Sequence, residues 1–345
     1  MGEMQMTSAV VPKTLEQVLD PAWLSTALEA PVRAVEQVEL IRTVATKVRF
    51  LAHMADGSSR ALCLKGLLDV DEMTARGGPT MVREADFYGF VAAEVDVRVP
   101  RHVCSVIDRE GQQAVVIMRD LIADGTRFCS ALEPFTAQHA SASLDQIARL
   151  HAGRGLLAGM AWIDRRIDSL AEAKYITAEQ LQALLNGPRG EPLPKDILSA
   201  SRVIAAMQEI ARRDAKLPQF LVHGDAHAGN IFHEAGGPGL IDWQLLQSGG
   251  WALDVAYHVC AVLPVEVAEV EERALLTHYL AEMRALGCEL PDAETAWRQY
   301  REAAAYGYYL WAITRRVDPA ITHVFVERLG KAVVRHDTFS LLGGA

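Results

Sequence analysis

Residues 222–243 read VHGDAHAGNIFHEAGGPGLIDW, and this stretch decides how the rest of the chain is interpreted. His223, Asp225 and Asn230 have the spacing H-x-D-x-x-x-x-N, and Asp242 follows a short hairpin-like segment and two apolar residues. In a phosphoryl-transfer site, one carboxylate accepts the proton of the attacking hydroxyl, while an amide oxygen and a second carboxylate hold the magnesium ion on ATP. We therefore predict that Asp225 is the base and that Asn230 and Asp242 bind the metal.

The neighbouring polar residues of this motif have other readings. His223 and His227 could be metal ligands, but the nearby oxygen ligands suit magnesium and no cysteine lies close in the sequence. We expect His223 to brace the loop, and we derive no role for His227. Asp254 follows Asp242 by 12 positions and is expected to tie its helix to the catalytic loop, the alternative being a charge at a helix N-terminus.

Upstream, Lys65 ends the strand-like segment ALCLK. Side chains alternate along a strand, so Cys63 and Lys65 share one face. Lys65 could then reach the phosphates of a nucleotide, with Glu84 on the following helix as the carboxylate that fixes its ammonium group. Cys63 is expected to cover the adenine. The alternative for this pair is a surface lysine and a solvated glutamate.

Residues 115–121, VVIMRDL, form an apolar run that leads into polar residues. We predict that this segment ends in a hinge. Backbone groups near Arg119 and Leu121 would hydrogen-bond adenine, with Met118 behind the base.

The order of predicted elements indicates an α+β, bilobal, protein-kinase-like fold. Strand patterns and the hairpin turn DGSS precede residue 70, two more strands follow at 102–107 and 113–118, and the later part is mostly helical. We expect a nucleotide-binding lobe with a small antiparallel sheet at 1–118, a hinge at 119–124 and a helical lobe with the catalytic loop and substrate site at 125–345. The helices are expected at 13–30 with a break at Pro21, and at 81–94, 136–152, 162–185, 194–214, 252–262, 266–286, 292–316 and 320–341, and the only strands after residue 135 at FLVHG and GLIDW.

Bulk properties exclude several classes of function. The net charge of −10 argues against a nucleic-acid surface, which needs clustered basic residues. The five cysteines are scattered without a C-x-x-C pair, which fits a reducing cytosol rather than a disulfide framework. The first ten residues, MGEMQMTSAV, lack the features of a signal peptide, and no apolar stretch is long enough to span a bilayer. We expect a cytoplasmic monomer or homodimer that does not bind membranes.

On these residues the chain resembles the aminoglycoside phosphotransferase-like family of small-molecule kinases. HGDAHAGN and IDWQ match that family's HGDxHxxN and IDW patterns, and ALCLK, READFYGFV, VIMRDL and IARLHA resemble its lysine strand, glutamate helix, hinge and following helix. The resemblance covers roughly residues 35–260. It implies ATP and Mg²⁺ as co-substrates and the roles given above for Asp225, Asn230 and Asp242. The DWQ form is more similar to the ecdysteroid-kinase-like branch.

Two departures from the family pattern bear on the site. The loop IRTVATKV has no glycine where many relatives place Gly or Ser over the phosphates. Phosphate contacts there would fall to backbone amides, with Thr43 and Thr46 as candidate side chains. The tail RHDTFSLLGGA carries Asp337 as its one acid, whereas aminoglycoside-modifying members tend to end in several acidic residues.

The acceptor is expected to be a hydroxyl of a small molecule, because Asp254 follows Asp242 too soon to leave room for a peptide-docking platform. The walls of the acceptor-binding site should come from residues 155–215 and 290–320. Four aromatic residues would suit an apolar or ring-shaped alcohol if they line a cleft, and are core residues otherwise: Tyr306, Tyr308, Tyr309 and Trp311. We expect an ATP- and Mg-dependent phosphotransferase acting on a neutral or hydrophobic alcohol (steroid-like, polyketide or hydroxy acid). The alternatives are an aminoglycoside or macrolide resistance kinase and a nucleotide-binding pseudokinase.

Overall fold

The protein is described here by a computed structural model that covers residues 9–43 and 45–343. The chain falls into two compact units. Unit 1 comprises the residues up to Glu94, Arg98–Arg127 and Ile241–Leu245, and unit 2 comprises Val95–Val97, Phe128–Leu240 and the residues from Leu246 onward. The motif that begins at Val222 therefore lies in unit 2 and ends, at Asp242 and Trp243, in unit 1. The hinge role of 119–124 stays a prediction, and the expectation about a signal peptide falls mainly on residues 1–8, outside the described residues.

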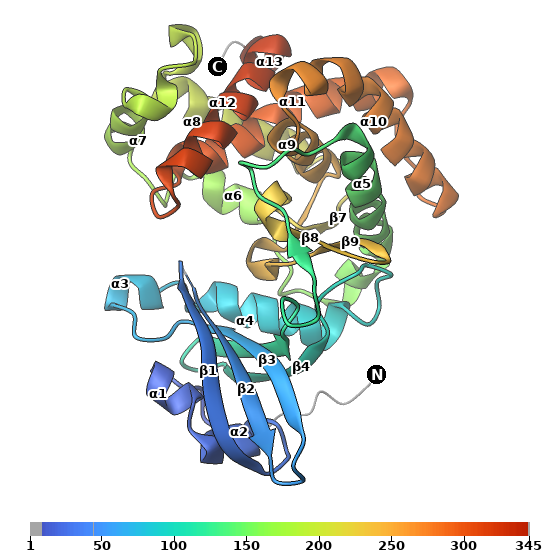
Figure 1. The fold of residues 1–345 in the computed structure, drawn as a ribbon. Coiled ribbons are helices and arrows are strands. Elements are labelled where there is room, and N and C mark those ends of the chain that lie inside the picture. Colours follow the sequence, from blue (N-terminus) through green and yellow to red (C-terminus); the bar gives the residue numbers. More distant parts are fainter. Residues whose placement is uncertain (1–8, 44, 344–345) are drawn as a thin grey trace. The chain divides into compact units, whose positions relative to one another are not determined.

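Unit 1 is built on a five-stranded antiparallel sheet with the strand order β1-β2-β3-β5-β4 (Figure 1). Gly57 has a φ of 87° in the β2–β3 hairpin turn, and the Asp56 carboxylate accepts a hydrogen bond from the Ser58 amide. A glycine adopts this backbone without strain, which explains why the DGSS segment turns the chain. The strands are β1 (Val32–Arg42), β2 (Thr46–Met54), β3 (Ser59–Gly66), β4 (His102–Asp108) and β5 (Gln113–Arg119).

The two faces of this sheet are covered by different helices. Leu62 and Leu64 of β3 point to the face on which α1 (Leu15–Val18) and α2 (Pro21–Ala27) pack. Because strand side chains alternate, Cys63 and Lys65 point to the opposite face. There the short α3 (Glu72–Ala75) is followed by α4 (Gly78–Asp86), which packs on β5. A π-helical turn, Phe87–Val91, extends α4.

Unit 2 is mainly helical and carries short strand pairs around the motif. β7 pairs with β10, and β8 pairs with β9, each antiparallel. Its strands are β7 (Phe220–Val222), β8 (Ile231–Glu234), β9 (Gly237–Leu240) and β10 (Gln247–Gly249), while β6 (Arg127–Phe128) stands where the chain leaves unit 1. Its helices are α5 (Ala137–Ala152), α6 (Arg166–Ala171), α7 (Ala178–Leu185), α8 (Ala200–Asp214), α9 (Ala252–Val262), α10 (Val265–Ala285), α11 (Ala293–Ile313), α12 (Pro319–Arg335) and α13 (Thr338–Leu341).

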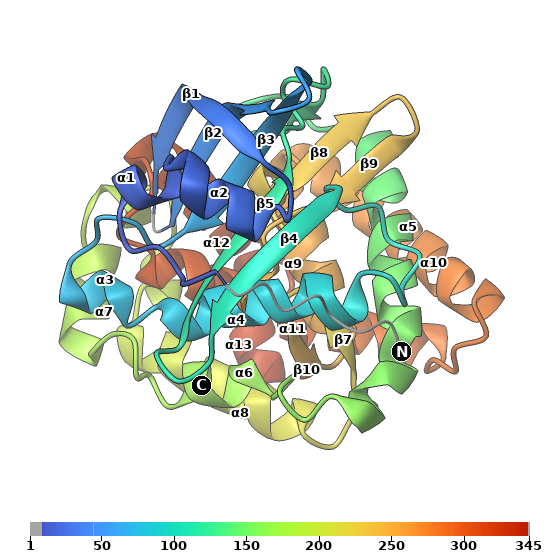
Figure 2. The ribbon, with the colours of Figure 1, turned by 90° about the horizontal axis from the view of Figure 1, so that it is seen from below.

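The core of unit 2 is centred on α9, whose residues are all buried. α11 and α12 pack against α9, and α10 runs beside α5 (Figure 2). A helix that is buried on all sides needs neighbours around its whole circumference. α9 therefore provides a rigid support for the loop that precedes it in the chain. Among the described helices, none combines the length and the hydropathy needed to cross a bilayer.

Several predicted boundaries differ from the structure for local reasons. The helix expected over 162–185 is two helices, because Ala173 adopts a left-handed backbone (φ 52°) and Thr177 begins α7 with a capping box. The helix expected over 320–341 is likewise interrupted at Asp337, where φ is 50°. The helix expected at 194–214 begins as α8 only after Ser199, which caps its N-terminus. The strand expected at GLIDW ends at Leu240, and β8 and β10 were not expected.

Candidate functional site

A buried lysine held by two carboxylates forms the first group of candidate site residues, and it lies within unit 1. The Nζ atom of Lys65 is 2.7 Å from Oε2 of Glu84 and 2.9 Å from Oδ1 of Asp242. The side chains of Lys65 and Glu84 are 3% and 1% exposed, whereas that of Asp242 is 23% exposed. Burial alone would lower the pKa of Lys65, but the charges of Asp242 and Glu84 outweigh it and raise the pKa. The ammonium group therefore stays charged.

Local packing holds the segment 241–245 against α4. The Trp243 ring stacks on Phe87 of the π-helical turn, with centroids 3.6 Å apart and planes 9° apart. Asp242 itself has a φ of 68°, a left-handed conformation that few residue types other than Gly, Asn and Asp adopt readily. A left-handed backbone at a carboxylate that contacts a buried lysine makes Asp242 a candidate site residue.

The remaining nucleotide-site candidates of unit 1 have mixed surroundings. Met118 pairs directly with Cys63 across β3 and β5, so both side chains lie on the face that carries Lys65. Burial raises the pKa of the Cys63 thiol to about 11, which keeps it protonated. The Arg119 amide donates to the Arg101 carbonyl, and the Leu121 carbonyl accepts from the Thr126 amide, so these two backbone groups already have partners. The adenine-binding roles stay predictions.

The two threonines proposed for phosphate contacts differ in their surroundings. Thr46 is 3% exposed, and its hydroxyl donates to the Leu68 carbonyl at 3.2 Å. A phosphate contact by Thr46 would require that bond to break. The Thr43 hydroxyl donates to the Ala45 carbonyl at 2.9 Å in the partly exposed loop. A phosphate contact by Thr43 would likewise require this bond to break, and both contacts remain predictions.

The second group lies within unit 2 and centres on Asp225, whose side chain is 26% exposed. Nδ2 of Asn230 donates to the Asp225 carbonyl at 2.8 Å and to its Oδ2 at 3.2 Å. The five-residue spacing thus turns the chain back so that both side chains meet. With Nδ2 committed to Asp225, the oxygen of the Asn230 amide is the atom left to face a cation. Nε2 of His227 lies 3.6 Å from Oδ2 of Asp225, while its Nδ1 accepts from the Gly229 amide.

The loop before Asp225 is anchored on a buried carboxylate, as expected for Asp254. Oδ2 of Asp254 accepts from the His223 amide at 2.7 Å, and its Oδ1 accepts from the Gly224 amide at 2.8 Å. Gly224 needs to be glycine, because its φ is 81°. His223 braces the loop, since its Nδ1 accepts from the Asp225 amide at 3.2 Å. Asp254 is fully buried and also contacts His151 at 3.1 Å.

Three contacts to this loop were not anticipated from the sequence. The Tyr257 hydroxyl donates to Oδ1 of Asp225 at 2.9 Å, and the Tyr306 hydroxyl donates to the Gly224 carbonyl at 2.8 Å. His258, next to Tyr257, uses its Nδ1 to bond the Ala226 carbonyl at 2.8 Å. Tyr257 follows Asp254 by three positions on α9, so helical spacing was the signal that could have identified it as a neighbour of the loop.

The aromatic residues of α11 belong to the core of unit 2. Tyr306, Tyr308 and Tyr309 are fully buried, and Trp311 is 5% exposed. Tyr308 and Tyr309 donate their hydroxyls to backbone carbonyls, of Ile197 and Leu170 respectively. Their polar tips are therefore satisfied inside the protein. These side chains do not form an exposed aromatic wall, and they give no support to a ring-shaped acceptor.

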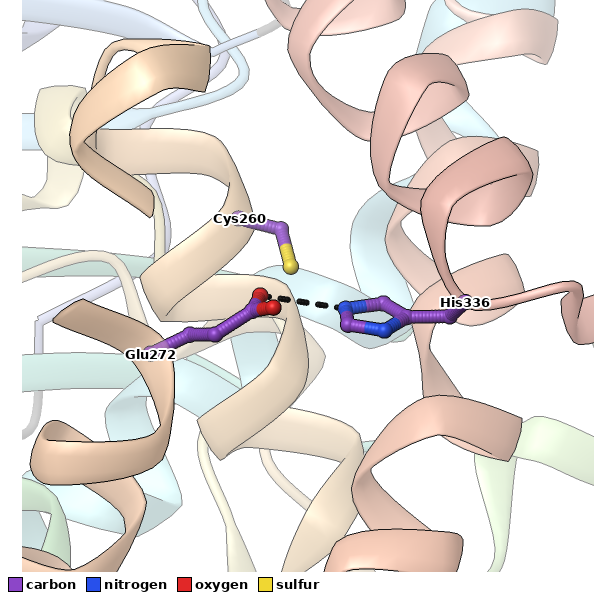
Figure 3. A group of neighbouring side chains, drawn as sticks. All are labelled: Cys260, Glu272 and His336. Atoms are coloured by element: carbon purple, nitrogen blue, oxygen red, sulfur yellow. Dashed lines mark hydrogen bonds and ion pairs between the residues drawn. The ribbon is translucent and has the colours of Figure 1, made fainter. Parts of the chain in front are cut away.

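A third group, Cys260, Glu272 and His336, joins three helical segments of unit 2 and is drawn in Figure 3. The set offers metal-ligand atoms, but its charge is already balanced. Nη2 of Arg335 and Nε2 of His336 lie 2.8 Å and 3.0 Å from Oε2 of Glu272. Burial raises the pKa of the Cys260 thiol to about 12, so it is not a thiolate. We interpret this group as an internal tie between helices rather than a metal centre.

The sequence pattern of the phosphotransferase enzyme family matches residues 74–319, which is more than half of the chain. No curated protein matches the sequence significantly.

Two solved structures share the fold. A candidate aminoglycoside phosphotransferase from Ralstonia eutropha is 13% identical with a TM-score of 0.55, and the match covers 91% of this chain and 97% of that one. A choline kinase from Cryptosporidium parvum is 9% identical with a TM-score of 0.53, covering 94% and 93%. At such low identity these matches report on fold alone, and they confirm the predicted bilobal, kinase-like fold. The ecdysteroid-kinase-like branch stays a prediction. Because the family pattern covers more than half of the chain, including Glu84 and the motif around Asp225, this chain belongs to the phosphotransferase enzyme family.

Proposed function

We propose that the protein transfers the γ-phosphoryl group of ATP to a hydroxyl group of a small molecule, with Mg²⁺ as the required cation. The observation that carries the proposal is the buried Lys65, whose ammonium group is fixed between Glu84 and Asp242. A fixed ammonium group is suited to nucleotide phosphates, because its position costs nothing to establish when the nucleotide binds. In this proposal Lys65 holds the phosphates and Glu84 orients it.

The residues proposed for the metal have suitable chemistry. Asp242 offers a partly exposed carboxylate, and Asn230 offers the amide oxygen that remains when its Nδ2 bonds Asp225. Such hard oxygen ligands suit Mg²⁺ better than they suit a softer metal. The bound cation would neutralise charge that develops on the phosphates.

Asp225 is the proposed base. Its carboxylate is partly exposed, and its geometry is fixed by donors on both oxygens, from Tyr257 and Asn230. A positioned general base contributes about 10²–10⁴-fold to a rate. In the proposed reaction Asp225 accepts the proton of the acceptor hydroxyl as its oxygen bonds to the phosphorus of the γ-phosphoryl group and the bond to ADP breaks.

The acceptor class is proposed from the sequence. A neutral or hydrophobic alcohol remains the first class to test, and the buried aromatic residues of α11 no longer add support to it. Amino-sugar and macrolide antibiotics are the second class. A pseudokinase is the third possibility, although every residue of the proposed set is present.

The proposal is tested by transfer of labelled γ-phosphate from ATP to two pools of acceptors, neutral alcohols and polycationic amino sugars. We expect label in one pool with the wild-type protein and none with Asp225→Asn. Asp242→Asn is the matched metal-site variant, because Asn also tolerates the left-handed backbone at this position. It should weaken the stabilisation by Mg-ATP, whereas Asp225→Asn should preserve it. If the Asp225→Asn protein retained turnover, Asp225 would be excluded as the base. If the wild-type protein bound Mg-ATP without any phosphate transfer, the pseudokinase alternative would be supported.

A further inference from the structure

A chain of two hydrogen bonds ends on the proposed base. Nε1 of Trp311, on α11, donates to the Tyr257 hydroxyl at 2.7 Å, and this hydroxyl donates to Oδ1 of Asp225 at 2.9 Å. We propose that Tyr257 and Trp311 are positioning residues that fix the orientation of the Asp225 carboxylate for proton acceptance. This inference rests on the proposed function and adds two residues from distant parts of the chain to it.

The direction of these hydrogen bonds follows from the chemistry of the side chains. An indole N–H can only donate, so the Tyr257 oxygen must be the acceptor of the first bond. The single proton of Tyr257 is then left for Asp225, which must accept it. Trp311 thus holds the phenol from one side while the phenol donates to Asp225 on the other, so the position of the Tyr257 hydroxyl is set by both partners.

Both oxygens of the carboxylate are restrained. Oδ1 accepts from Tyr257, and Oδ2 accepts from Nδ2 of Asn230 at 3.2 Å. Rotation of the carboxylate about its Cβ–Cγ bond would break both bonds at once. Nε2 of His227, at 3.6 Å from Oδ2, is a further titratable group facing Asp225. The carboxylate thus presents a fixed direction for the remaining lone pairs, as positioned catalysis needs.

Packing fixes the donor in turn. Tyr257 is fully buried, and a Cβ atom on Gly307 would lie 2.5 Å from its Cδ2, so α11 approaches the ring closely only because this residue is glycine. The Trp311 ring packs on Phe325 with centroids 4.2 Å apart. Burial, together with the negative charge of Asp225, holds the pKa of Tyr257 well above its ordinary value, so the phenol remains a donor at any working pH.

The test replaces Tyr257 with Phe, which keeps the ring and removes the donor. We expect kcat to fall about tenfold, with KM for ATP changed less than twofold, because one hydrogen bond to a charged group is lost while nucleotide contacts are kept. Trp311→Phe should have the same effect at smaller size, about threefold in kcat. When no acceptor has been found, hydrolysis of ATP by water replaces transfer as the assay.

Tyr308→Phe is the matched control. Tyr308 also loses a buried hydroxyl, but this hydroxyl bonds the Ile197 carbonyl and does not touch Asp225. We expect Tyr308→Phe to lower stability to a similar extent and to leave kcat and the KM for ATP unchanged. Equal kcat values for the Tyr257→Phe and Tyr308→Phe proteins would overturn the inference while leaving the proposed function intact, provided that Asp225→Asn is inactive. The inference and the proposed function would both be overturned by an active Asp225→Asn protein. They would also be overturned by a wild-type protein that transfers phosphate from ATP neither to an acceptor molecule nor to water.

Discussion

Gly307 allows the close approach of α11 to Tyr257, and its replacement by Ala tests whether that packing matters. The new Cβ would lie 2.5 Å from Cδ2 of Tyr257 and 2.9 Å from Cδ2 of Leu329. Carbon atoms in ordinary contact are about 3.5–4.0 Å apart, so the tyrosine ring would have to retreat by about 1 Å. Its hydroxyl is bonded at 2.7 Å to Trp311 and at 2.9 Å to Asp225, so a shift of this size would stretch at least one bond beyond the usual range.

The expected cost combines two opposing effects. Overpacking a well-packed core costs roughly 1–3 kcal/mol. Replacing Gly by Ala inside a helix stabilises the folded state by about 1 kcal/mol, because Ala has the higher helix propensity. We therefore expect Gly307→Ala to lower the free energy of unfolding by up to about 2 kcal/mol and to lower kcat several-fold, with an unchanged KM for ATP.

Gly330→Ala provides the matched control, because the residue is also a glycine inside a helix of unit 2. Its Cβ would lie 2.5 Å from Cδ1 and 2.7 Å from Cδ2 of the buried Leu193. This variant should therefore also lower stability through overpacking, but it should leave kcat unchanged, because Leu193 is not among the residues described above as contacts of Tyr257 or Asp225. Urea denaturation gives the stability of each variant and phosphotransfer, or ATP hydrolysis, gives the rate. Gly307→Ala and Gly330→Ala proteins with the same kcat would refute the reasoning.

Three further predictions concern other buried groups. Lys65→Met leaves the buried Glu84 unpaired and should destabilise unit 1 by about 3–5 kcal/mol in urea denaturation; a loss below 1 kcal/mol would contradict the ion-pair geometry. Burial lowers the pKa of His258 from its ordinary 6.5 to about 4. Between pH 6.5 and pH 4 the unfolded chain therefore binds a proton at this residue that the folded chain does not bind. Stability should therefore fall by up to ~3 kcal/mol between pH 7 and pH 4, and His258→Gln should remove this part of the slope; parallel pH curves for the two proteins would exclude it. Cys63, with a pKa of about 11, should react slowly with thiol reagents at pH 7, and Mg-ATP should slow it further if the residue covers adenine, whereas equal labelling rates would place it elsewhere.

The parts of the site that the sequence predicted are those in which function fixes residue type and spacing. Asp225 and Asn230 meet because five positions suffice for one turn of the loop, and Lys65 and Glu84 pair because strand and helix periodicities set the faces that they share. The Trp311 contact could not be predicted in this way. It joins residues 54 positions apart, and only the packing of α11 on α9 brings the indole to Tyr257.

Boundaries were predicted less well than elements, because single residues outside any periodic pattern decide them. Three residues adopt left-handed backbones close to the end of an element. They are Ala173 after α6, Asp242 after β9 and Asp337 after α12. Ala has no side-chain feature that signals this conformation, and the surrounding fold imposes it. The burial of the α11 aromatics is a similar case, since an aromatic run has the same sequence pattern whether it lines a cleft or fills a core.

The π-helical turn after Glu84 affects how this chain should be compared with its relatives. In Phe87–Val91 the amide of Ala92 bonds to the Phe87 carbonyl, five residues back, instead of four. A relative whose helix is α-helical throughout reaches the same end point with one residue fewer. An alignment without a gap would match Glu84 correctly and then misassign every position after the turn by one. The gap belongs within Phe87–Val91, and evolutionary or mutational data from a relative can be transferred to the residues beyond it only after that correction.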